Sequence, residues 1–199
     1  MKKPGPKLIL ILIFALFLAP VLVAVFLNSS WTDFRPALIS SSGQLVEPAV
    51  GLTGRLENYR GVQLGPEVFN NRWWMISYAP YGCHLECLGR LTELRQIHRS
   101  LGKDQPAVGV ALISGVSLEV NQVEKVHAVF EDIIQLYDFG GQYQRQINEL
   151  TAKLSGSSPY TFIVDPMANL ILLYQADADP AGIRQDLARL LRLSQRDPS

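Results

Sequence analysis

The chain has very few side chains that exchange disulfides or bind soft metals: two cysteines and three histidines among 199 residues. Only Cys83 and Cys87 carry thiols, so any thiol chemistry falls to this one pair. A surplus of positive charge is also missing, because 18 basic residues balance 18 acidic ones. Without a basic patch interleaved with aromatic residues, the chain lacks the electrostatic signature of a nucleic-acid-binding protein.

Charge is absent altogether from Leu8 to Leu27, an apolar run that follows three lysines. At about 1.5 Å per residue, a helix of this length spans the roughly 30 Å hydrocarbon core of a bilayer. A cleaved signal peptide is the alternative, but its apolar region usually has only about 7 to 15 residues. We therefore expect a cytoplasmic tail (1–7) and a single-pass inner-membrane anchor (8–27). The positive-inside rule then places the following domain in the periplasm of a bacterial host.

The rest of the chain predicts a linker and one folded α/β domain. Residues 28–61 are rich in Ser, Gly and Pro, which indicates a linker with short strands, and Glu47-Pro48 is a turn signal. The domain (62–199) alternates apolar runs of strand length with helical periodicity. Strands are expected at 73–78, 107–113, 160–164 and 170–174, and helices at 83–101, 120–137, 142–154 and 180–193. Strands that alternate with helices indicate parallel pairing, and the last two strands form an antiparallel hairpin.

The most informative stretch runs from Arg72 to Cys87: a short apolar strand, a Pro/Gly turn, and a Cys-x-x-x-Cys motif opening an amphipathic helix. Helical residues four apart have Cα atoms roughly 6 Å from each other, within disulfide range. The helix N-terminus presents N–H groups and a positive dipole end that stabilise a thiolate. Cys83 is therefore the predicted attacking thiol and Cys87 the resolving thiol. The alternative is a static disulfide that staples the helix start.

The same two sulfurs are soft ligands suited to Cu(I), so Cys83 and Cys87 are also candidate metal ligands. A third ligand is not evident. His98 shares the cysteine face but lies roughly 16 Å along the helix axis from Cys87. His84 points about 100° away from Cys83, and His127 lies in an apolar stripe typical of a core histidine. The residues alone leave the choice between disulfide exchange and copper binding open.

The order of elements, with a cysteine motif after the first strand and a proline opening the third, resembles the thioredoxin fold. Within it the chain resembles the Sco/SenC-type proteins, membrane-anchored factors for cytochrome c oxidase assembly. The resemblance is carried by Trp74 to Cys87 with its three-residue cysteine spacing, by the single N-terminal anchor, and by Phe162 to Pro166. It covers about Leu64 to Leu193.

This resemblance implies a thioredoxin-like thiol–disulfide protein that acts on a copper-site cysteine pair. The implied partner is a cytochrome c oxidase subunit or another assembly factor, and Cu(I) is the implied cofactor of the alternative, a copper chaperone. A non-catalytic assembly scaffold is a third hypothesis. Pro159 fits the position at which thioredoxin-like proteins place a cis-proline beside the cysteines, with an ordinary trans proline as the alternative.

The chain departs from the family pattern at three places. The family's copper-ligand histidine would fall near Ser157 or Ser158, where there is no histidine. His84 stands where a proline usually follows the first cysteine, and the family's acidic motif is not evident in Ser114 to Ser117. These departures favour disulfide exchange over a complete copper site.

Overall fold

The computed structural model describes residues 42–115, 127–152 and 160–194, together with positions 7, 16, 18 and 19. Within these residues no helix is both long and apolar enough to cross a membrane. The anchor predicted over Leu8 to Leu27 lies almost entirely outside them. The chain divides after Ser40, and the residues from Ser41 onward form one compact unit.

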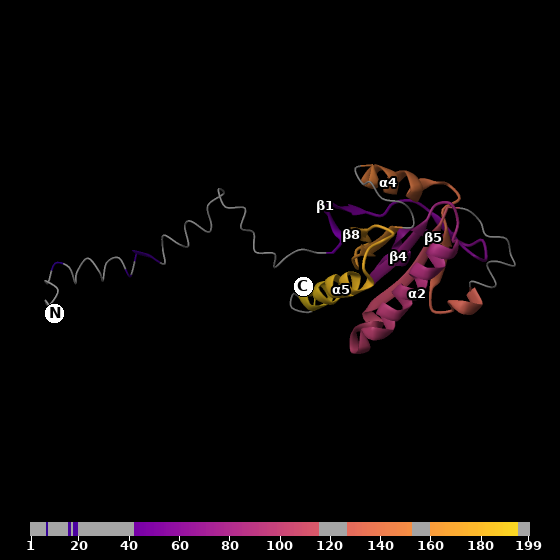
Figure 1. The fold of residues 1–199 in the computed structure, drawn as a ribbon. Coiled ribbons are helices and arrows are strands. Elements are labelled where there is room, and N and C mark those ends of the chain that lie inside the picture. Colours follow the sequence, from indigo (N-terminus) through magenta and orange to yellow (C-terminus); the bar gives the residue numbers. More distant parts are fainter. Residues whose placement is uncertain are drawn as a thin grey trace. The chain divides into compact units, whose positions relative to one another are not determined.

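The described residues of this unit form an eight-stranded sheet in the order β1-β8-β7-β4-β5-β6-β2-β3 (Figure 1). β4 pairs in parallel with β5, and β5 with β6, whereas all the other neighbours are antiparallel. The strands are β1 Gln44–Gly51, β2 Leu56–Asn58, β3 Gln63–Leu64, β4 Trp73–Ala79, β5 Val108–Ser114, β6 Ile134–Tyr137, β7 Tyr160–Val164 and β8 Asn169–Tyr174.

Helices cover both faces of the sheet (Figure 1). Residues of α2 and α5 share one hydrophobic cluster with Met75 and Ala79, and residues of α4 share a second cluster with Trp74, Ile76 and Tyr78. Alternate side chains of β4 therefore face opposite layers, and all seven of its residues are buried, as expected for a central strand. The helices are α2 Leu85–Ser100, α4 Gln142–Thr151 and α5 Pro180–Ser194, with 3-10 turns η2 Pro66–Phe69 and η3 Gly102–Ala107.

The α/β architecture predicted from the sequence is confirmed, but the helix predicted over 120–137 is wrong over its last part. Residues 134–137 form strand β6, which pairs in parallel with β5. A short apolar run is compatible with both a helix and a strand. Here the run forms a strand because its backbone pairs with the edge of β5. Residues 127–129 are helical, and 116–126 lie outside the described residues.

The sheet also extends N-terminal to the predicted domain boundary at residue 62. β1 pairs with β8, and β2 pairs with β6, so the strands expected in the linker belong to the domain's own sheet. Glu47-Pro48, predicted as a turn, lies inside β1 where the register with β8 shifts. β1 is an edge strand, where a proline without an N–H is tolerated.

Arg90 is a charged residue on the buried side of α2. The side chain is only 5% exposed. Its guanidinium donates hydrogen bonds to the carbonyl oxygens of Ala176 and Ala178, the latter at 3.0 Å, and pairs with Glu93 at 2.8 Å. Arg90 therefore joins α2 to the segment between β8 and α5.

Candidate functional site

The two cysteines lie together at the carboxyl end of the central strand. Cys83 and Cys87 form a disulfide with their Cα atoms 5.0 Å apart. The helix begins later than predicted, because His84 is an extended N-cap residue and Leu85 is the first residue of α2. Cys83 therefore lies just before the helix, and Cys87 lies in its first turn.

The loop that carries Cys83 is tied to the end of β4. The carbonyl oxygen of Ala79 accepts hydrogen bonds from the backbone N–H groups of Gly82 and Gly115, both at 3.1 Å. Gly82 has a φ of 97°, which glycine adopts without steric cost. A Cβ atom on Gly115 would lie 2.3 Å from the carbonyl oxygen of Pro80, so only glycine fits there. Gly82 and Gly115 thus fix the position of the loop that carries the disulfide at the end of β4.

The two sulfurs differ in their access to solvent. Cys83 is 8% exposed and Cys87 only 2%. No described side chain caps the start of α2, so the first backbone N–H groups of the helix have no side-chain acceptor. Such groups stabilise a thiolate at a helix N-terminus. The arrangement is suited to attack at Cys83 followed by resolution from Cys87.

Apolar side chains are exposed on both sides of Cys83. Tyr81 is 75% exposed and Leu85 is 86% exposed. Leu85 borders a hollow of about 550 Å³, lined also by His84, Glu86 and Leu88. Sequence reasoning missed this hollow because it placed the helix start at Cys83. The signal available was an apolar residue, Leu85, at an outward position two residues after the first cysteine.

The other aromatic residues of this stretch belong to the core. Trp73 and Trp74 are 9% and 1% exposed, and Tyr78 is fully buried. Burial, and then the negative charge of Asp138, raises the pKa of Tyr78 well above its ordinary value. Asp138 accepts hydrogen bonds from two backbone N–H groups of α4 and is buried beside that helix. Tyr78 is thus a neutral core phenol, and Tyr81 alone of the four aromatics faces solvent.

The two described histidines considered as ligands, His98 and His127, contact other parts of the fold. Pro159 lies outside the described residues; the next residue, Tyr160, pairs with Tyr78 at the cysteine end of β4. The Nε2 of His98 lies 3.0 Å from the carbonyl oxygen of Val108. The ring of His127 contacts that of Tyr59, with the centroids 5.0 Å apart. Within the described ranges, no three His, Cys, Asp or Glu side chains gather as a metal site would require.

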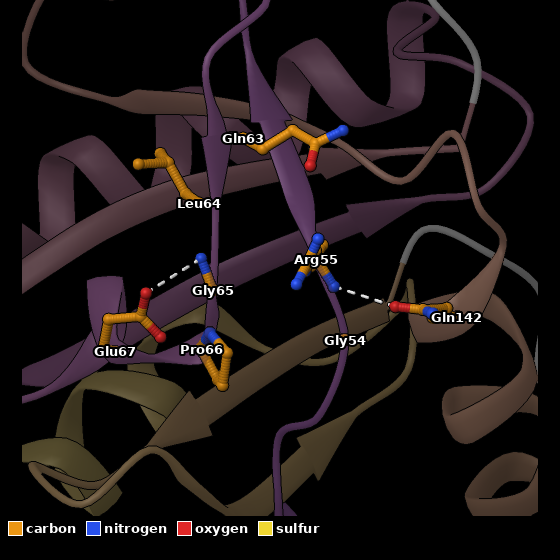
Figure 2. Close-up of a pocket in the computed structure, with 8 residues that line it drawn as sticks. All are labelled: Gly54, Arg55, Gln63, Leu64, Gly65, Pro66, Glu67 and Gln142. Carbon is orange, nitrogen blue, oxygen red and sulfur yellow. Dashed lines mark hydrogen bonds between the residues drawn. The ribbon is translucent and has the colours of Figure 1, made fainter.

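A second, polar hollow of about 840 Å³ lies between the β2–β3 hairpin and the start of α4 (Figure 2). The backbone N–H of Arg55 donates to the side-chain oxygen of Gln142 at 2.9 Å, and that of Gly65 donates to Glu67 at 3.2 Å. The side-chain oxygen of Gln142 and one carboxylate oxygen of Glu67 thus already bond to the protein's own backbone, and no cysteine lines the hollow. Its lining residues are Gly54, Arg55, Gln63, Leu64, Gly65, Pro66, Glu67 and Gln142.

A family model matches residues 73–194, from the start of β4 to the end of α5. Its description is a transmembrane-like, thioredoxin-like, C-terminal domain. The chain belongs to this family. The matched region contains the disulfide, the central strand that positions it and both helices of the cysteine face. A search of curated proteins found no match.

Solved structures of Sco proteins and thiol-disulfide oxidoreductases share this family member's fold. Yeast Sco1 with copper bound is 12% identical, with a TM-score of 0.60 over 74% of this chain and 95% of that one. BsSco, a Sco-family cytochrome c oxidase assembly protein with a disulfide switch, is 15% identical, with a TM-score of 0.53 over 73% and 95%. The thioredoxin domain of a thiol-disulfide oxidoreductase from Bacteroides vulgatus is 12% identical, with a TM-score of 0.51 over 77% and 99%. The chain therefore has a Sco-like thioredoxin fold.

Proposed function

We propose that this protein performs thiol–disulfide exchange during the assembly of cytochrome c oxidase. The observation that carries the proposal is the Cys83–Cys87 disulfide at the end of β4, with Cys83 the more exposed sulfur. In the reduced protein the Cys83 thiolate attacks a partner disulfide, and the partner's first thiolate leaves. The Cys87 thiolate then attacks the Cys83 sulfur and releases the partner as a dithiol. Two electrons pass to the partner, and a dithiol reductant restores the pair.

The proposed partner is the copper-site cysteine pair of an oxidase subunit, or another assembly factor that carries it. The domain faces the periplasm, held at the inner membrane by the predicted helix at 8–27. Support for the partner comes from the Sco-like fold and from the description of BsSco as an oxidase assembly protein. Support for exchange comes from the redox-capable cysteine pair and from the similarity in fold to a thiol-disulfide oxidoreductase.

A second candidate function is delivery of Cu(I) as cargo. Two thiolates from Cys83 and Cys87 are soft ligands that suit this ion, and the similar yeast Sco1 structure contains copper. Among the described residues, no third His, Cys, Asp or Glu side chain joins these two sulfurs in a metal-binding group. A third candidate is an assembly scaffold whose disulfide is structural. Because the cysteine pair is present but a third ligand is not among the described residues, exchange is the function that the site supports best.

The cellular test compares oxidase assembly in host cells that carry the wild-type chain, Cys83→Ser, or Leu193→Ser as an exposed control on α5. We expect oxidase activity to be lost with Cys83→Ser and kept with Leu193→Ser, because exchange requires the attacking thiolate. Oxidase activity at the wild-type level with Cys83→Ser, at equal protein abundance, would favour the scaffold.

A further inference from the structure

We propose that the surface formed by Tyr81, His84, Leu85 and Leu88, named the exchange surface, binds an extended partner segment whose cysteine is flanked by a bulky apolar residue. This inference rests on the proposed exchange function and adds a partner specificity to it. Leu85 is 86% exposed and Tyr81 75%, and these two large side chains lie two residues after and two residues before Cys83. Apolar patches of this kind mark interaction sites.

The occupant follows from the chemistry of the site. A mixed disulfide brings the partner's sulfur within about 2 Å of the Cys83 sulfur. In an extended segment each further residue adds about 3.3 Å, so residues next to the partner cysteine come within reach of Tyr81 or Leu85, which lie two residues from Cys83 in the chain. The occupant of this surface is therefore the same segment that presents the cysteine.

The hollow beside Leu85 determines which side chain fits. It has a volume of about 550 Å³ and is bordered by two leucines, Leu85 and Leu88. Among its lining residues the one carboxylate is Glu86, which repels an acidic neighbour. A leucine or phenylalanine beside the partner cysteine buries apolar area here, whereas an aspartate does not. The hollow thus selects apolar over acidic flanks.

The test measures attack by Cys83 on two model peptides, with the full chain in detergent and Cys87→Ser in every variant, so that Cys83 is the only thiol. Each peptide carries one cysteine as a mixed disulfide with thionitrobenzoate, flanked by Leu and Phe in one peptide and by Asp and Ser in the other. The Cys83 thiolate attacks the peptide sulfur, the bond to thionitrobenzoate breaks, and the coloured thiolate leaves. The readout is the ratio of the two second-order rate constants.

We expect the apolar peptide to react roughly tenfold faster, because burial of one apolar side chain in the hollow stabilises its complex with the protein. Leu85→Ser should lower this ratio severalfold, with Glu86 still disfavouring the acidic peptide, and the matched control Leu193→Ser should leave the ratio unchanged. Equal rates for both peptides, or a ratio that Leu85→Ser does not change, would overturn the exchange surface. Reaction with neither peptide would overturn the surface and the exchange function together. If oxidase assembly in cells requires Cys83 but both peptides react at the same rate, the exchange surface is rejected and the exchange function is kept.

Discussion

Cys83→Ser is expected to lose all disulfide exchange, whereas Cys87→Ser should accumulate a stable mixed disulfide with its substrate. Only a thiolate attacks a disulfide, and a serine hydroxyl is not ionised at neutral pH. Cys83 is the more exposed sulfur and precedes the first turn of α2, so it forms the first bond. Cys87 is only 2% exposed and is bonded to the Cys83 sulfur, so a partner meets Cys83 first.

The measurement follows reduction of an oxidised dithiol peptide by each reduced variant, with non-reducing electrophoresis and mass spectrometry to identify the adduct. The wild type should produce free peptide dithiol. The roles assigned to the two sulfurs would be reversed if Cys83→Ser formed the adduct and Cys87→Ser did not. The doubly substituted variant provides the background rate.

Arg90→Ala is expected to lower the free energy of unfolding by roughly 3 kcal/mol. The substitution leaves the half-buried carbonyl groups of Ala176 and Ala178 without their donor. A fully buried unpaired polar group costs about 1 to 3 kcal/mol, so each of these two contributes toward the lower end of that range. It also opens space beside a side chain that is 5% exposed. Arg90→Lys should recover only part of the loss, because one ammonium group cannot reproduce the planar guanidinium fork.

Urea unfolding followed by tryptophan fluorescence, to which the buried Trp73 and Trp74 contribute, measures this effect. The matched control is Glu93→Gln, which removes the ion pair but keeps Arg90 and its two carbonyl bonds. Because the Glu93 side chain is 41% exposed, its ion pair is worth at most about 1 kcal/mol. An Arg90→Ala variant as stable as Glu93→Gln would show that the carbonyl bonds do not hold α2 in place.

The central part of the fold could be predicted because its strands are apolar runs between clear turn signals. The hairpin was placed correctly: Tyr160–Val164 matches the predicted strand, and Asp165 closes the turn by accepting from the N–H groups of Met167 and Asn169. β6 could not be predicted, because Ile134 and Tyr137 continue an apolar pattern that suits a helix equally well. Only pairing with β5, a contact distant in sequence, settles its structure.

The candidate site also has features that could be predicted from the sequence and features that could not. Cys83 and Cys87 could be paired from their spacing, and the structure joins them. The position of the helix start could not be found from periodicity, since the extended N-cap at His84 depends on the loop tied to Ala79. For the same reason the exposure of Leu85 and its hollow emerged only from the structure. Local spacing thus located the two paired sulfurs, and tertiary contacts defined the surface around them.

The most direct test of the central claim is the reduction potential of the Cys83–Cys87 pair in the full chain, measured with and without Cu(I). Thiol–disulfide exchange predicts a potential of roughly −200 to −270 mV, in the range of thioredoxin-like proteins, and no retained copper after desalting. A potential far below about −300 mV would instead identify a structural disulfide. Tight one-to-one binding of Cu(I) by the reduced pair would contradict the exchange account and support a copper carrier.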